Sequence, residues 1–138
     1  MPEAGPSKGK IKFKIVSPLA LIVECEVDSV SLPLIAGETL ILPRRAPLLA
    51  AVKTGKIIIT NAGKKEVYFV SKGIAEIRRD ICAVCAWGIA KKDVKPEEIK
   101  IQIERLEKHQ SALHSNSERK MIEDLISFLS WILSCHLN

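Results

Sequence analysis

Several patterns that carry enzymatic chemistry are missing from this sequence. Its 138 residues contain no phosphate-binding glycine-rich run, no His-Glu-x-x-His zinc motif and no Gly-x-Ser-x-Gly nucleophile motif. The paired carboxylates Glu97 and Glu98 occur where a helix is expected to begin, so a structural role accounts for them. We therefore predict a protein that is not an enzyme and that has no catalytic residue, no metal site and no cofactor.

Long hydrophobic runs are also missing. The first ten residues contain no apolar run, so they do not resemble a secretory signal. The longest charge-free stretch, Leu125 to Asn138, has 14 residues. A membrane-spanning helix needs about 20. These absences predict a cytoplasmic protein.

Cysteine and histidine are scarce. The cysteines are Cys25, Cys82, Cys85 and Cys135, and the histidines are His109, His114 and His136. Cys82 and Cys85 have the spacing of a zinc or redox motif, but they lie in an apolar run that is typical of a strand. Residues three apart on a strand point to opposite faces. We therefore expect small buried or half-buried cysteines and ordinary surface or boundary histidines.

Aromatic residues make up only 4% of a chain whose formal net charge is +5. All of that excess lies in residues 1–90, because residues 91–138 contain eight basic and eight acidic side chains. A small basic β domain leaves open a stand-alone adaptor or a nucleic-acid-binding protein as the alternative function. Single-strand binders need exposed aromatic faces, whereas Phe13 and at least one of Tyr68 and Phe69 are expected in the core. Nucleic acid is therefore not an expected partner.

Short strands dominate the first part of the chain. Ile11, Phe13 and Ile15 alternate with lysines, which is typical of a half-buried strand. The segment 61–65 predicts a hairpin turn with a glycine available for positive φ, and the segment 78–80 predicts a second short connection between strands. Eight or so short strands without an intervening helix predict an antiparallel sandwich or barrel.

Residues 32–55 are the most informative stretch. Three prolines and two glycines interrupt apolar runs that are too short for helices. The residues that we expect to shape this stretch are Pro33, Gly37, Pro43, Pro47 and Gly55. Proline removes a backbone donor, and glycine tolerates positive φ. The stretch therefore predicts short strands joined by tight turns, with Arg44 and Arg45 presented on a bend.

The periodicity changes after residue 90. Pro96 suits the first turn of a helix, and apolar residues then recur at helical spacing, which predicts a helix over 96–113. Ser115 and Glu118 have capping-box spacing, so a second helix can begin there. The predicted domains are a flexible arm (1–10), a β-sandwich (11–90) and an antiparallel helical hairpin (91–138).

The order of residues around Leu32-Pro33, Gly37-Glu38, Ile41-Leu42-Pro43 and Ala46-Pro47-Leu48-Leu49 resembles the epsilon subunit of F-type ATP synthases, which is called delta in mitochondria. The segment 68–77, which includes Gly73 as a further loop-shaping residue, is similar to the family's Val-Ser-x-Gly strand pair. The resemblance covers roughly residues 12–78, and this chain has Arg45 where the family usually has histidine. The family's fold is an α+β arrangement of an N-terminal antiparallel β-sandwich followed by a C-terminal two-helix hairpin.

The resemblance also implies a function. Family members belong to the central stalk, where the sandwich grips the gamma subunit and the proline-rich loop reaches the membrane c-ring. By position, Glu38, Arg44 and Arg45 correspond to the contact residues. In many members the hairpin can extend along gamma and restrain ATP hydrolysis, in which case the catalytic alpha and beta subunits become partners. The family's nucleotide motif in the first helix is missing here, so no nucleotide site is expected. Such a subunit lies on the inner face of the bacterial membrane only through its complex.

Overall fold

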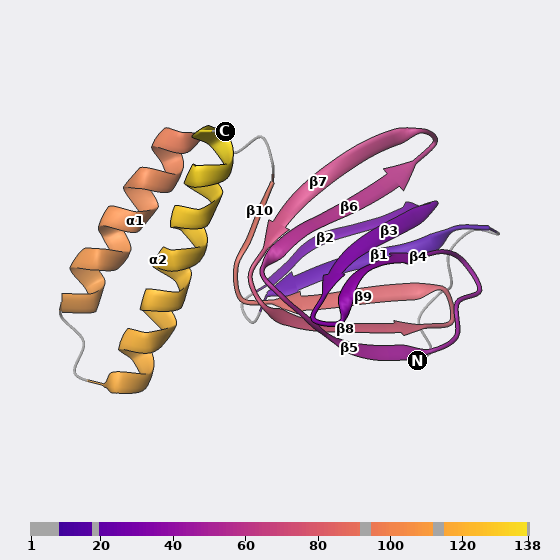
Figure 1. Cartoon of the computed structure of the whole chain (residues 1–138), viewed down its shortest axis with the longest axis horizontal. Coiled ribbons are helices and arrows are strands. Elements are labelled where there is room, and N and C mark those ends of the chain that lie inside the picture. Colours follow the sequence, from indigo (N-terminus) through magenta and orange to yellow (C-terminus); the bar gives the residue numbers. More distant parts are fainter. Residues whose placement is uncertain (1–8, 18–19, 92–94, 112–114, 138) are drawn as a thin grey trace. The chain divides into compact units, whose positions relative to one another are not determined.

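The computed structural model describes residues 9–17, 20–91, 95–111 and 115–137. Most of the predicted arm of residues 1–10 and the predicted boundary residue His114 lie outside these ranges. The chain divides into two compact units, residues 1–92 and residues 93–138. Figure 1 shows the strands of the first unit and the two helices of the second.

The first unit is one mixed β-sheet that folds over into a sandwich (Figure 1). Its ten strands in the described residues are β1 (Ile11–Ser17), β2 (Ala20–Val27), β3 (Ser29–Leu34), β4 (Gly37–Ile41), β5 (Leu48–Val52), β6 (Gly55–Asn61), β7 (Lys64–Val70), β8 (Gly73–Arg78), β9 (Ile81–Ala86) and β10 (Ile89–Lys91). The order across the sheet is β10-β7-β6-β3-β5-β8-β9-β1-β2, and β4 pairs with β3 outside this path. The expected sandwich is confirmed.

One pairing differs from the expected antiparallel pattern. Strand β1 pairs antiparallel with β2 but parallel with β9, with Lys12 opposite Ile81 and Val16 opposite Cys85. Turn signals identify only strands that are neighbours in sequence. The parallel pair joins segments that lie far apart in the chain, so no local signal indicates it.

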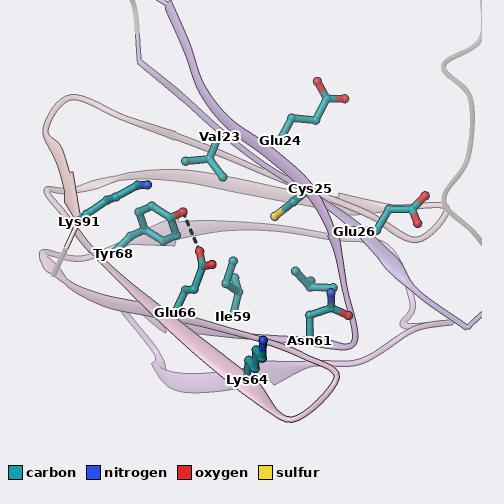
Figure 2. A pocket seen from close by; sticks show the side chains of 11 residues that line it. Val23, Glu24, Cys25, Glu26, Ile59, Asn61, Lys64, Glu66, Tyr68 and Lys91 are labelled. Atoms are coloured by element: carbon teal, nitrogen blue, oxygen red, sulfur yellow. Dashed lines mark hydrogen bonds between the residues drawn. The ribbon is translucent and has the colours of Figure 1, made fainter. Parts of the chain in front are cut away.

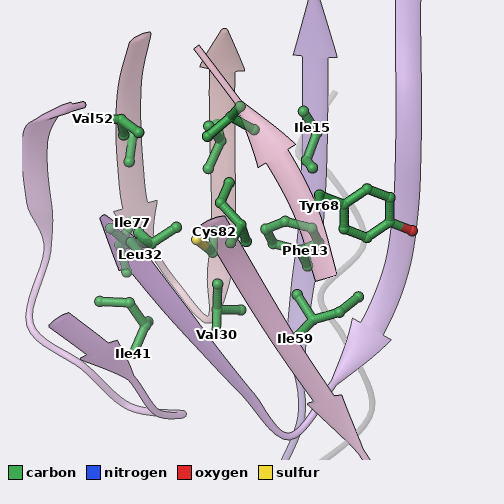
Figure 3. Packing of buried hydrophobic residues seen from close by; sticks show 14 of the residues in the cluster. Phe13, Ile15, Val30, Leu32, Ile41, Val52, Ile59, Tyr68, Ile77 and Cys82 are labelled. Carbon is green, nitrogen blue, oxygen red and sulfur yellow. The ribbon is translucent and has the colours of Figure 1, made fainter. Parts of the chain in front are cut away.

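Alternating side chains from the strands form the core (Figure 3). Ile11, Phe13 and Ile15 of β1 are buried, whereas Lys12 and Lys14 between them are only half-buried. Complete burial of one such large apolar side chain stabilises the fold by about 1.5 to 3 kcal/mol. The prediction that Phe13 and at least one of Tyr68 and Phe69 lie in the core is confirmed, because all three side chains are buried.

The predicted hairpin at residues 61–65 is confirmed and contains a two-residue turn. Asn61 lies opposite Lys64, and the turn residues Ala62 and Gly63 have φ angles of 52° and 78°. The backbone N–H of Ala62 donates a 2.8 Å hydrogen bond to Oδ2 of Asp28. The ammonium of Lys10 contacts Oδ1 of the same carboxylate at 2.5 Å. This carboxylate therefore ties the turn to the start of β3.

The second unit is a pair of helices packed against each other. Helix α1 spans Pro96–Ser111 and α2 spans Asn116–Leu137, with Glu97 and Glu98 in the first turn of α1. Both predicted helices are confirmed, although the residues that follow Ser111 lie outside the described range. The buried side chains of this unit are Ile99, Ile122, Phe128, Leu129 and Ile132. Neither helix, over the described residues, is long and apolar enough to cross a membrane.

Candidate functional site

The proline-rich stretch forms three short strands, as the sequence predicts. Pro33 is buried inside β3, close to the point where β3 changes neighbours. Strand β3 pairs with β6 over Ser29–Ser31 and with β5 only at Leu34. The loop from Leu42 to Pro47 connects β4 to β5 and contains Pro43.

Arg44 and Arg45 lie exposed on this loop. Arg44 has a φ of 66°, in the left-handed region that side chains other than glycine rarely adopt. The structure does not bring Glu38 to these arginines. Glu38 lies opposite Pro33 near the beginning of β4, whereas Arg44 and Arg45 follow the end of that strand. The three residues named from the resemblance thus occupy the two ends of one strand.

A second turn lies beside the arginine loop. Arg79 and Asp80 join β8 to β9 with φ angles of 49° and 60°, so both residues are left-handed. Oδ1 of Asp80 accepts a 2.5 Å hydrogen bond from the backbone N–H of Arg44. The Asp80 carbonyl accepts another from the N–H of Lys12, at 2.8 Å. The sequence predicts this turn but gives no sign that its aspartate holds the proline loop.

The two turns present four exposed arginines, which we call the arginine surface: Arg44, Arg45, Arg78 and Arg79. Only Arg78 has an ionic partner among the described residues, because its Nε lies 3.1 Å from Oε1 of Glu76. All the arginines of residues 1–90 therefore lie at the β8–β9 turn and the neighbouring loop, whereas the other basic residues of that range are lysines. Arg78 and Arg79 were not among the predicted site residues.

A strip of exposed apolar side chains crosses the outer face of β5, β8 and β9. Leu49 and Ile74 are 72% and 56% exposed. Ala51 lies opposite Ile74, and Ile74 lies opposite Cys85, so these side chains share one face. We call Leu49, Ala51, Ile74 and Cys85 the outer strip. Exposed apolar patches of this kind mark surfaces that bind other proteins. The strip was not among the predicted site residues, although the consecutive leucines at 48 and 49 cannot both face the core from one strand.

Three glycines that were expected to shape the loops have different roles. Gly37 has a φ of 132°, which fits the expected tolerance of positive φ. The same expectation for Gly55 is wrong, because Gly55 is not among the positive-φ residues. A Cβ at Gly55 would lie 2.8 Å from Cβ of Pro33, so close packing requires glycine there. Gly73 is tighter still, since a Cβ would lie 2.0 Å from the carbonyl oxygen of Cys85.

A pocket of about 420 Å³ opens between β2 and the β6–β7 hairpin (Figure 2). Cys25 lines it together with Glu66 and Tyr68, whose hydroxyl donates a 3.1 Å hydrogen bond to Oε2 of Glu66. Burial raises the pKa of the Cys25 thiol, and the charge of Glu66 raises it further. The thiol therefore stays protonated and is a poor nucleophile at neutral pH.

The cysteines of β9 follow the expected alternation. Cys82 is fully buried and Cys85 is exposed, so the two thiols lie on opposite faces of one strand. Burial raises the pKa of Cys82 to about 12. The prediction that the cysteines are buried or half-buried is wrong for Cys85, because the outer face of β9 is not covered. The predicted surface position of His109 is confirmed, and the side chain of His136 lies outside the described part of the structure.

Comparison with known proteins agrees with this architecture. The profile of the family described as "ATP synthase, Delta/Epsilon chain, beta-sandwich domain" matches residues 10–92. The ATP synthase epsilon chain of Mesorhizobium japonicum is 30% identical over 121 residues, which cover 86% of this chain and 90% of that protein. The epsilon chain of Halalkalibacterium halodurans is 32% identical over 115 residues, or 82% and 86% of the two chains.

Solved structures show the same fold. A chain of the Euglena gracilis mitochondrial ATP synthase, in a cryo-EM structure of its OSCP, F1 and c-ring parts, matches with a TM-score of 0.64 at 16% identity. That match covers 99% of this chain and 86% of the other. A chain in the central stalk and c-ring structure of the Tetrahymena thermophila mitochondrial enzyme matches with a TM-score of 0.53 at 9% identity, over 93% and 99% of the two chains.

A β-sandwich with exposed apolar and basic surfaces, followed by a helical hairpin, is thus the architecture to which the comparisons apply. The chain belongs to the ATP synthase delta/epsilon chain family. Members of this family are non-catalytic subunits of the ATP synthase, and the expectation that this protein is not an enzyme agrees with that membership.

Proposed function

We propose that this chain is a rotor subunit that joins the gamma subunit to the membrane c-ring of an F-type ATP synthase. In this proposal the β-sandwich, residues 11–90, makes both contacts, and the hairpin of residues 91–138 is a separate module. The subunit would transmit torque between proton-driven ring rotation and ATP synthesis. It would lie at the inner face of the bacterial membrane only through the complex.

The observation that carries the proposal is the outer strip. Leu49 and Ile74 are more than half exposed on neighbouring strands, whereas the opposite face of the same strands is buried in the core. Burying large apolar side chains on association is favourable by about 25 cal/mol for each Å² of apolar surface removed from water. A sheet face of this kind suits a permanent partner, and gamma is the partner that the family resemblance implies for the sandwich.

The loop that follows β4 supplies the second contact in this proposal. Arg44 and Arg45 are exposed beside Pro43 and Pro47, which restrict the backbone on both sides. Guanidinium groups bind polar and acidic loops through charge-assisted hydrogen bonds. We assign Arg44 and Arg45 to the c-ring contact. Glu38, at the other end of β4, would contact a different part of the rotor.

The test uses the full chain and the purified gamma subunit of the same organism. Leu49→Lys and Ile74→Lys should each weaken gamma capture at least about tenfold, because each buries a charge in the interface; the effect should be smaller for Leu49→Lys, since Leu49 lies opposite Glu76. Ile101→Lys is the matched control, since Ile101 is 50% exposed but lies on α1. Circular dichroism should show that all three variants fold. Full gamma binding by both strip variants, or its loss only in Ile101→Lys, would contradict the assignment.

A further inference from the structure

We propose that Arg79 acts together with Arg44 and Arg45 as one rigid surface that binds carboxylates on the ring-side partner, with Asp80 as the residue that positions them. This inference rests on the proposed function and extends it to a turn that the resemblance does not include. Its support comes from three features of the arginine surface.

The first feature is the physical link between the two segments. Leu48, at the start of β5, lies opposite Ile77 near the end of β8, so the loop before β5 lies next to the turn after β8. The hydrogen bond from the Arg44 N–H to Oδ1 of Asp80, at 2.5 Å, joins them directly. The carbonyl of Asp80 is held in turn by the N–H of Lys12 on β1. Two other segments of the chain, the loop before β5 and strand β1, therefore fix the position of this turn.

The second feature is the backbone conformation. Arg44, Arg79 and Asp80 all have positive φ, although none of them is glycine. Such residues persist where the surroundings hold them in place, and they cluster at functional sites. A glycine would satisfy the backbone at each position more easily. Arginine at 44 and at 79 therefore adds a side chain where folding alone favours its absence.

The third feature is the state of the guanidinium groups. Arg78 is paired with Glu76, at 3.1 Å. In contrast, the side chains of Arg44, Arg45 and Arg79 make no hydrogen bond or ion pair with any residue that the structure describes. Guanidinium presents its donors in a planar fork that fits a carboxylate. The restrained backbone limits where these three groups can lie, which lowers the entropic cost of binding an acidic partner.

The fixed geometry favours a protein partner over a lipid surface. Adsorption to anionic lipid depends on the number of basic residues near the membrane and requires no defined arrangement of them. Here a main-chain hydrogen bond from Arg44 to Asp80 joins the two segments that carry the arginines, and a purely electrostatic attraction would not need it. The polar loops of the membrane ring are the protein surface that the proposed function places next to this end of the sandwich.

The experiment measures binding of the full chain, in complex with gamma, to the purified detergent-solubilised ring. Arg79→Ala should weaken binding about tenfold. Lys100→Ala is the control, because it removes the same charge from an exposed position on α1 and should bind like the wild type. Equal affinities for Arg79→Ala and Lys100→Ala would overturn the inference. If the wild-type complex does not bind the ring at all, the proposed function itself fails.

Asp80→Gly separates positioning from net charge. Glycine accepts the φ of 60° at this position, so the turn backbone is preserved while the acceptor for the Arg44 N–H is lost. The variant is one unit more positive than the wild type, so simple electrostatic attraction predicts tighter binding to an acidic partner. The positioning role predicts weaker binding, by about threefold to tenfold. Tighter binding would overturn the positioning role of Asp80.

A parallel measurement uses vesicles of phosphatidylglycerol and phosphatidylcholine. We expect weak, salt-sensitive adsorption that Arg79→Ala and Lys100→Ala reduce equally. Loss of vesicle binding in Arg79→Ala alone, with unchanged ring binding, would assign this surface to lipid and overturn the inference.

Discussion

Two turns of the same sheet adopt the same left-handed backbone conformation with different residues. The β6–β7 turn uses Ala62 and Gly63, and the β8–β9 turn uses Arg79 and Asp80, yet all four residues have positive φ. Right-handed strand twist favours this turn geometry in two-residue hairpins, and glycine is the residue that adopts it with least strain. The first turn follows that preference with Gly63, whereas the second has Asp80, one of the few other residue types that tolerate positive φ, and Arg79, which is not. The residues of the β6–β7 turn serve the fold alone, whereas the β8–β9 turn also presents Arg79 on the arginine surface.

Each turn is also associated with an aspartate that accepts a backbone N–H. Asp28 holds Ala62 of the β6–β7 turn, and its charge is neutralised by Lys10. Asp80 instead reaches out of its own turn to the N–H of Arg44, and the guanidinium groups around it stay exposed. The same kind of hydrogen bond thus closes a hairpin in one place and aligns two basic segments in the other.

The largest effect should come from the opposite end of the β8–β9 hairpin. Gly73→Ala would place a Cβ 2.0 Å from the Cys85 carbonyl oxygen, so the two strands must separate. We expect the free energy of unfolding to fall by about 3 kcal/mol or more. Gly63→Ala is the comparison, because nothing lies within 4 Å and only its φ of 78° opposes the change. It should cost about 1 to 2 kcal/mol. Urea denaturation of both variants measures the difference, and equal losses would contradict it.

A smaller effect on the free energy of unfolding, opposite in sign, is expected at the β8–β9 turn. Arg79→Gly relieves the left-handed strain at φ 49° and should raise the free energy of unfolding by up to about 1 kcal/mol, since the greater flexibility of glycine in the unfolded chain offsets part of the gain. Arg45→Gly is the control, because Arg45 is not among the positive-φ residues and the change should destabilise the fold slightly. The urea midpoints of the two variants show whether each substitution stabilises or destabilises the fold. A loss of stability in Arg79→Gly would mean that its side chain supports the fold.

The smallest effect on stability concerns Asp28, the aspartate that holds the β6–β7 turn. Hydrogen bonds from Lys10 and from the Ala62 N–H lower the pKa of Asp28. A lowered folded-state pKa contributes stability above the unfolded pKa, which is about 3.9, and that contribution disappears as the pH falls through the folded-state value. Asp28→Asn should therefore be less stable than the wild type at pH 7 and equally stable in strong acid. Thermal melts across this pH range test the prediction, and a constant difference would refute it.

Local patterns predicted much of the fold. The alternation of Ile11, Phe13 and Ile15 identified β1, the glycine at 63 identified the β6–β7 turn, and Pro96 identified the start of α1. Each of these signals acts within a few residues of its effect. The family resemblance added Arg44 and Arg45 as contact residues, which remains a prediction.

The unpredicted features depend on residues that are distant in sequence. The parallel pairing of β1 with β9 and the contact between Gly55 and Pro33 arise only when the sheet assembles. The outer strip likewise needs the register that sets Ile74 opposite both Ala51 and Cys85. The role of Asp80 required the proximity of two turns, and periodicity carries no information about such proximity.

The parallel contact between β1 and β9 has a consequence for biogenesis. Lys12 cannot take its place beside Ile81 until the ribosome has released the segment that contains β9. Closing so long a loop is entropically costly, and topologies dominated by such contacts fold slowly. The first strand to be synthesised, with its buried Phe13, is therefore exposed for longest in the nascent chain, and it is there that a chaperone would have most to protect.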